Sequence, residues 1–144
     1  MTKTYLTFTL FLFFVISGII SCQKNKETGT VAPIAITKET LAGSYKLTAA
    51  TTGGISVYNN LEDCQKDDIS KLNADFTAAY IDAGIKCNPP GDDVGTWNLV
   101  SSKKIVIIGQ EADIVSYDGK TLVVSGMDNS TGFNLLVTLT YTKQ

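Results

Sequence analysis

Acidic residues in two loops are the side chains of this sequence with the widest scope for chemistry. Asp67 and Asp68 lie together in one loop, and Asp92 and Asp93 lie together in another. Carboxylate oxygens gathered on loops are ligands that Ca²⁺ prefers, so these four residues form a candidate calcium site. Their spacing does not match an EF-hand loop, and exposed acidic loops are usually only solvated, so both interpretations stay open.

Other catalytic groups are scarce, because the 144 residues include no His. This excludes Ser–His and Cys–His nucleophile pairs and the commonest zinc ligand. Paired carboxylates could act on glycans, but no pattern sets two of them across a cleft in different environments. All 12 cationic residues are Lys, against 14 Asp and Glu, and this balance argues against nucleic acid. We therefore expect a non-enzyme with no cofactor and no nucleic-acid partner.

Aromatic residues at strand spacing form a candidate ligand-binding site. Their phenol and indole donors, set among aliphatic residues, suit a pocket that is mostly apolar with a few directional polar groups. Core packing is the competing interpretation, because aromatic residues at this spacing more often fill a core than line a pocket. The candidate residues, which share the inward parity of the predicted strands, are Tyr45, Phe76, Tyr80, Trp97, Phe133 and Tyr141.

Strict alternation of apolar and polar residues predicts the strands that must position these aromatics. The alternation is clearest from Phe133 to Tyr141. Asp118-Gly119, between two apolar runs, is the strongest hairpin signal in the chain. The remaining strands are expected over residues 44–49, 68–72, 76–80, 96–99, 104–109, 114–117 and 121–126.

About eight short strands joined by tight turns predict an all-β, antiparallel up-and-down barrel, because closure hides the strand edges. A short helical turn over 37–43 should precede it, with Thr37 as N-cap. Thr40, rather than Glu, follows three residues later, so no full capping box is expected. Parity places five apolar residues on the outer face of the barrel: Val100, Val106, Ile108, Val123 and Leu136.

Residues 1–21 have the parts of a secretory signal peptide, with Lys3 followed by an apolar run over 6–20. The run is shorter than the roughly 20 residues that span a bilayer, although an uncleaved anchor is the alternative. The sequence Ile19-Ile20-Ser21-Cys22 resembles the lipobox of bacterial lipoproteins. That resemblance implies cleavage before Cys22 and acylation of its thiol and amine, which would hold the protein on a membrane.

The remaining cysteines follow from this assignment, because lipid on Cys22 leaves Cys64 and Cys87 as a pair. Export places them in an oxidising compartment, so we expect a disulfide between them. The Lys-, Glu-, Thr- and Gly-rich stretch 22–36 is expected to be a flexible tether to a domain over 37–144. Gln rather than Asp follows Cys22, and this favours the outer membrane of the cell envelope as the location.

The order of several short motifs points to a family. Gly43-Ser44-Tyr45 looks like the lipocalin entry motif, with Tyr in the place of Trp. The chain resembles the small lipocalin-like domains of bacterial lipoproteins over about residues 41–143, and the resemblance implies their barrel and their envelope location. The motifs that carry it, after the lipobox and tether, are Cys64-Gln65-Lys66-Asp67-Asp68, Cys87 and Gly95-Thr96-Trp97.

Two functions are compatible with these features. The first is a lipid-anchored envelope lipoprotein whose barrel binds a small apolar or glycan-like ligand. The alternative is a non-enzymatic structural or interaction subunit of an envelope complex, in which side chains fill the barrel. The first predicts a hollow lumen lined by the aromatic residues, and the second predicts a packed lumen and an apolar outer patch.

Overall fold

The computed structural model describes residues 34–129, 132 and 134–144. They form, in chain order, α1 (Lys38–Leu41), β1 (Gly43–Thr52), β2 (Ile55–Ser56), the 3-10 helix η1 (Tyr58–Asn60), α2 (Asp63–Lys66), β3 (Ile69–Leu72), β4 (Thr77–Ile81), β5 (Asp93–Ser101), β6 (Lys104–Ile107), β7 (Gln110–Tyr117), β8 (Thr121–Asp128) and β9 (Leu135–Lys143). The predicted leader, Cys22, most of the predicted tether and Phe133 lie outside the described residues.

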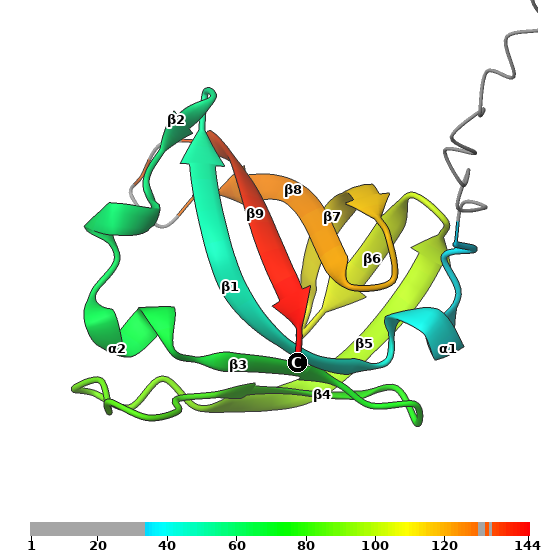
Figure 1. Ribbon diagram of the computed structural model, residues 1–144, viewed down its shortest axis with the longest axis horizontal. Helices are drawn as coiled ribbons and strands as arrows, with labels where there is room; N and C mark the ends of the chain where they lie inside the picture. Colours follow the sequence, from blue (N-terminus) through cyan, green and yellow to red (C-terminus); the bar gives the residue numbers. More distant parts are fainter. Residues whose placement is uncertain (1–33, 130–131, 133) are drawn as a thin grey trace, which may run out of the picture. The chain divides into compact units, whose positions relative to one another are not determined.

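The strands form one antiparallel sheet that closes on itself. Their order is β2-β1-β3-β4-β5-β6-β7-β8-β9, and β1 also pairs with β9, so the eight strands other than β2 form a barrel (Figure 1). Closure runs from Tyr45 opposite Lys143 to Thr52 opposite Val137. The short β2 pairs with the last two residues of β1, Thr51 and Thr52, whereas β3 pairs with the first part of β1, from Gly43 to Lys46. The predicted eight-stranded up-and-down barrel is confirmed.

The predicted helical turn is confirmed as α1, with one correction at its cap. The Thr37 hydroxyl accepts from the Thr40 amide at 3.3 Å, as an N-cap should. The Thr40 hydroxyl also accepts from the Thr37 amide at 2.9 Å, so the capping box is complete. Threonine at the third position of the helix can therefore replace the usual Glu of a capping box, because its hydroxyl can also accept a hydrogen bond from the N-cap amide.

The hairpin predicted at Asp118-Gly119 joins β7 to β8. The Asp118 carboxylate accepts from the amides of Lys120 and Thr121, at 2.9 and 2.6 Å. Gly119 has a φ of 92°, a left-handed conformation that glycine adopts without steric cost. These hydrogen bonds hold the pKa of Asp118 below its usual value.

Two residues break the alternation, and both have a positive φ. Phe76, at 69°, lies in the turn before β4 and is 38% exposed rather than facing inward. Ile108, at 49°, lies in the turn after β6 and packs against the core. The outward position predicted for Ile108 is therefore wrong, because the left-handed backbone reverses the side-chain direction. Val100 and Leu136 are exposed as predicted, whereas Val106 and Val123 are half-buried.

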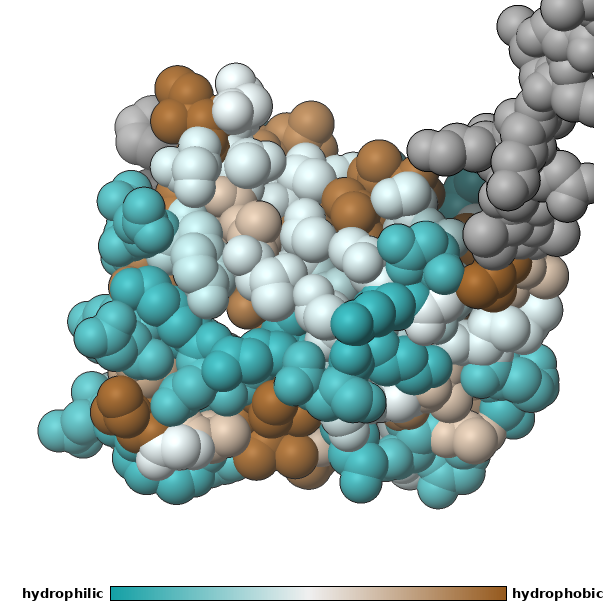
Figure 2. Space-filling model, in the orientation of Figure 1, coloured by the Kyte–Doolittle hydropathy of each residue, from teal (hydrophilic) through white to brown (hydrophobic). Residues whose placement is uncertain are grey.

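The outer surface differs between the wall and the rim of the barrel. Threonines such as Thr48 and Thr142 cover the outside of β1 and β9, which is pale in Figure 2. Apolar residues project at the end where β1 meets β2 and β8 meets β9, with Ile55 at 72%, Leu136 at 57% and Met127 at 55% exposure. We call this end the open end and the end beside α1 the closed end. In Figure 2 apolar surface gathers over the β2 hairpin.

Candidate ligand-binding site

Hydrogen bonds to α1 seal the closed end of the barrel. Leu41 is fully buried, and its carbonyl oxygen accepts from the Tyr45 hydroxyl at 2.6 Å. The carbonyl of Thr40 accepts from the Tyr117 hydroxyl at 2.5 Å and from the Lys143 ammonium at 2.9 Å. These side chains come from β1, β7 and β9, so the helix is held to three strands and forms the floor of the lumen.

Trp97 belongs to this floor. Its indole is 1% exposed and donates through Nε1 to the Asn73 carbonyl at 2.8 Å. Phe76 packs against it with ring centroids 5.5 Å apart, and the Lys38 ammonium lies 4.1 Å from the centre of the Phe76 ring. Neither Trp97 nor Phe76 lines either of the two cavities described below, so this pair supports the interpretation that these aromatic residues pack the core.

Above the floor lies a cavity of ≈ 280 Å³, which we call the first chamber. Three of the predicted ligand-binding residues, Tyr45, Tyr80 and Tyr141, line it. Its remaining wall is largely aliphatic, with Ile107 at the end of β6 and Ile108 in the turn that follows. A concave, mostly apolar cavity with a few tyrosines in its wall has the chemistry of a small-molecule site.

The hydroxyl of Tyr80 is fixed by a buried carboxylate. It donates to Asp68 Oδ2 at 2.5 Å, and the other oxygen of Asp68 accepts from the Ala83 amide at 3.1 Å. Burial raises the pKa of Tyr80, and the hydrogen bond to Asp68 and the charge of Asp68 raise it further. Burial also raises the pKa of Tyr141, an effect that a hydrogen bond with Ser70 partly offsets. Both phenols are therefore uncharged at neutral pH.

A second chamber of ≈ 420 Å³ lies toward the open end. Val57 and Leu61, on either side of η1, form one part of its wall, and Met127 of β8 forms another. Ala112 and Leu139 line both chambers, so the two cavities share a boundary. The barrel interior therefore holds two adjoining cavities, and Met127 of the apolar rim lines the larger of the two.

The four candidate calcium ligands do not assemble into a metal site. Asp67 accepts from the Ile85 amide at 2.8 Å, and Asp92 accepts from the Asp82 amide at 3.1 Å. Asp93 is exposed and bonds the amide of its own neighbour, Val94. Within the described part of the chain, no group of three or more His, Cys, Asp or Glu is placed to hold a metal ion. These carboxylates organise backbone amides instead.

Asp82 is a structural residue that the sequence analysis missed. It is fully buried, and its carboxylate accepts from the amides of Cys87 and Gly91 at 3.2 and 3.3 Å. Its backbone carbonyl accepts from the Lys86 ammonium. The predicted disulfide between Cys64 and Cys87 is confirmed, so Asp82 and the disulfide together fix the loop that follows β4. No sequence signal distinguished Asp82 from the solvated acids around it.

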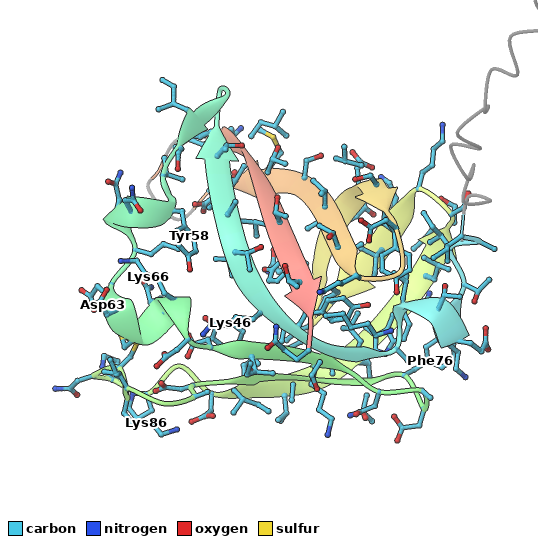
Figure 3. The ribbon with its side chains drawn as sticks, in the orientation of Figure 1. Lys46, Tyr58, Asp63, Lys66, Phe76 and Lys86 are labelled. Carbon is cyan, nitrogen blue, oxygen red and sulfur yellow. A yellow bond between two sulfur atoms is a disulfide. The ribbon has the colours of Figure 1, made fainter. Side chains whose placement is uncertain are left out.

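Two lysines, Lys46 and Lys66, lie near the barrel wall but outside both chambers. In Figure 3, Lys46, Lys66 and Tyr58 lie between strand β1 and the η1–α2 segment. The Lys66 ammonium is 3.0 Å from Asp63, and neither Lys46 nor Lys66 lines a chamber.

Among the described residues, no helix is both long and apolar enough to cross a bilayer.

The closed antiparallel barrel, with cavities inside it, has the architecture of up-and-down barrels large enough to hold one small ligand. A family model described as a lipocalin-like domain matches residues 41–124, which is more than half of the chain. The protein therefore belongs to the lipocalin-like domain family, as its motifs indicated. No match is found among curated proteins.

Proposed function

We propose that this protein is a lipid-anchored lipoprotein of the cell envelope that binds a small apolar ligand in its barrel. One observation carries the binding role: the first chamber, ≈ 280 Å³ in volume, is lined by three tyrosines and aliphatic side chains. The interaction-subunit alternative required a filled barrel, and two open chambers weigh against it. A mostly apolar wall also favours an apolar ligand over a glycan.

Binding rather than catalysis is the role that the carboxylates support. Asp68 and Asp82 are buried, and their oxygens accept hydrogen bonds from backbone amides and Tyr80. General acid–base work on a glycan needs two carboxylates that face a substrate in contrasting environments. Neither Asp68 nor Asp82 lines a chamber. We therefore assign them to structure.

The location rests on the leader, where Ile19-Ile20-Ser21-Cys22 follows an apolar run. The test is mass spectrometry of the protein isolated from bacteria that express the full chain. We expect a mature protein that begins at Cys22 and carries acyl chains, and an unprocessed, unacylated Cys22→Ser variant. A wild-type chain with a free thiol at Cys22 would refute the anchor.

The binding role is tested by native mass spectrometry of the same preparation, with a variant that reduces the cavity. Ala112 lines both chambers, so Ala112→Leu should reduce the amount of co-purified small molecule. Val115 lies on the same strand but is 58% exposed, and Val115→Leu is the matched control that should retain the ligand. Absence of any bound molecule in the wild type, together with failure to bind added hydrophobic probes, would refute the proposal.

A further inference from the structure

The polar groups of the first chamber limit which end group a ligand can present, an inference that rests on the binding function proposed above. The hydroxyl proton of Tyr80 is committed to Asp68, and that of Tyr45 is committed to the Leu41 carbonyl. A phenol whose proton is committed offers only the lone pairs of its oxygen. Toward a ligand, Tyr80 is therefore a hydrogen-bond acceptor, and the carboxylate behind it strengthens this character.

Tyr141 has the complementary role. Among the described residues, its hydroxyl donates to no protein acceptor. The proton of Tyr141 therefore remains available to an acceptor on the ligand. Tyr80 and Tyr141 line the same chamber, which therefore offers one acceptor and one donor.

Among the described residues that line the chamber, no cation is directed inward to balance a carboxylate. The chain has no Arg and no His, and Lys71 is the one lysine among the residues that line it. Lys71 is exposed and lies opposite Ala79 in the β3–β4 ladder, while its neighbour Leu72 is buried. Alternation along the strand therefore points its ammonium outward.

A negative charge lies beside the first chamber instead. Asp68 is buried and accepts the hydrogen bond of Tyr80, which lines that chamber. A buried anion without a counter-charge is strongly unfavourable, and a neighbouring carboxylate adds repulsion. An ionised fatty acid would meet both costs in this lumen.

We infer that the lumen selects an uncharged amphiphile whose polar end is a hydroxyl, and that it discriminates against the carboxylate of the same chain length. A hydroxyl can donate a hydrogen bond to Tyr80 and accept one from Tyr141. An ether oxygen can only accept. A carboxylate can also only accept, and it brings a negative charge into the lumen. The apolar remainder of the ligand extends past Ala112 and Leu139 toward the second chamber.

Three probes with one alkyl chain test this selectivity. Decan-1-ol, its methyl ether and decanoate are titrated by calorimetry into the full chain at neutral pH, below the concentrations at which the probes self-associate. Decanoate is ionised there, because carboxyl groups titrate near pH 4. We expect the alcohol to bind about tenfold tighter than the ether, the effect of one net hydrogen bond. Decanoate should bind more weakly than the ether.

Variants assign the preference to named groups. Tyr80→Phe should remove the advantage of the alcohol over the ether while the ether still binds. Asp68→Asn keeps a group that can accept from Tyr80 but loses the charge, and should narrow the gap between decanoate and the ether. Tyr58→Phe removes a hydroxyl from a half-buried tyrosine that lines neither chamber, and should leave all three affinities unchanged.

The outcomes separate this inference from the proposed function. If the wild type binds none of the three probes, the binding role fails and this inference fails with it. If the probes bind but decanoate equals the alcohol, or the ether equals it, the selectivity is refuted while the binding role stands. An alcohol preference that survives in Tyr80→Phe also refutes the assignment to Tyr80.

Discussion

The Tyr45 hydroxyl donates to the carbonyl of Leu41 at 2.6 Å, and this contact joins the first barrel strand to the helix that seals the lumen. Both residues are essentially inaccessible to solvent, at 1% and 0% exposure. The carbonyl therefore has no water to replace a lost donor. The side chain of Tyr45 thus connects the beginning of β1 to α1, the helix that forms the floor of the barrel.

Tyr45→Phe should destabilise the protein by about 1–3 kcal/mol, because it leaves a buried carbonyl unsatisfied while it keeps the ring. Urea unfolding of the full chain measures the change. Tyr58→Phe is the matched control, because the Tyr58 hydroxyl makes only a 3.4 Å contact with the Leu47 carbonyl. If the free energy of unfolding falls equally in the two variants, the hydrogen bond to the Leu41 carbonyl contributes no more to stability than the Tyr58 contact does.

The disulfide should contribute about 3 kcal/mol, because it closes a loop with a sequence separation of 23 residues. A Cys64→Ser, Cys87→Ser double variant should therefore unfold at lower urea concentration than the wild type. Addition of reductant to the wild type should lower its midpoint in the same way and leave the double variant unchanged. A reductant effect of equal size on both would contradict this assignment.

Gly84→Ala should be more destabilising than Gly109→Ala, although both glycines have a positive φ, 53° and 75°. A Cβ at Gly84 would lie 2.3 Å from Asp67 Oδ2, whereas nothing lies within 4 Å of one at Gly109. The backbone cost is common to both variants, roughly 1–2 kcal/mol, so the difference reports the contact with Asp67. Thermal unfolding of the two variants measures it, and matching midpoints would contradict the prediction.

Stability should fall as the pH rises above about 10, the ordinary pKa of tyrosine. Burial raises the pKa values of Tyr45, Tyr80 and Tyr141 in the folded protein. Above pH 10 the unfolded chain loses these protons while the folded chain keeps them, so the unfolded state binds fewer protons and the free energy of unfolding decreases. Urea titrations from neutral pH to pH 11 measure the decrease.

A free energy of unfolding that stays flat between neutral pH and pH 11 would contradict this account. Tyr45→Phe serves as the control, because it removes one of the three ionising groups. Its stability should decline less steeply with pH than that of the wild type.

The sequence predicted the barrel well because apolar and polar residues alternate along most strands. Where the backbone stays extended, this alternation correctly predicted that Tyr45, Tyr80 and Tyr141 face the lumen. The errors at Phe76 and Ile108 coincide with left-handed backbone at the ends of strands. Neither Phe76 nor Ile108 is a glycine, so nothing in the local sequence indicated a positive φ at these positions.

The site was harder to predict than the fold. Asp68 and Asp82 are buried whereas Asp93 is exposed, and this difference depends on how the disulfide-linked loops pack. Trp97 and Tyr80 share a parity, yet one fills the floor and the other lines the first chamber. The distance of a residue from the closed end decides between these roles, and this distance is set by register between strands.

Strand β1 pairs with β2, β3 and β9, so one ten-residue segment joins the beginning of the described chain to its end. Contacts between residues so distant in sequence slow folding, because the intervening chain must be ordered before they form. Until β9 arrives, the nascent sheet exposes two unpaired edges that invite intermolecular pairing. Chaperone protection during synthesis would matter most in that interval.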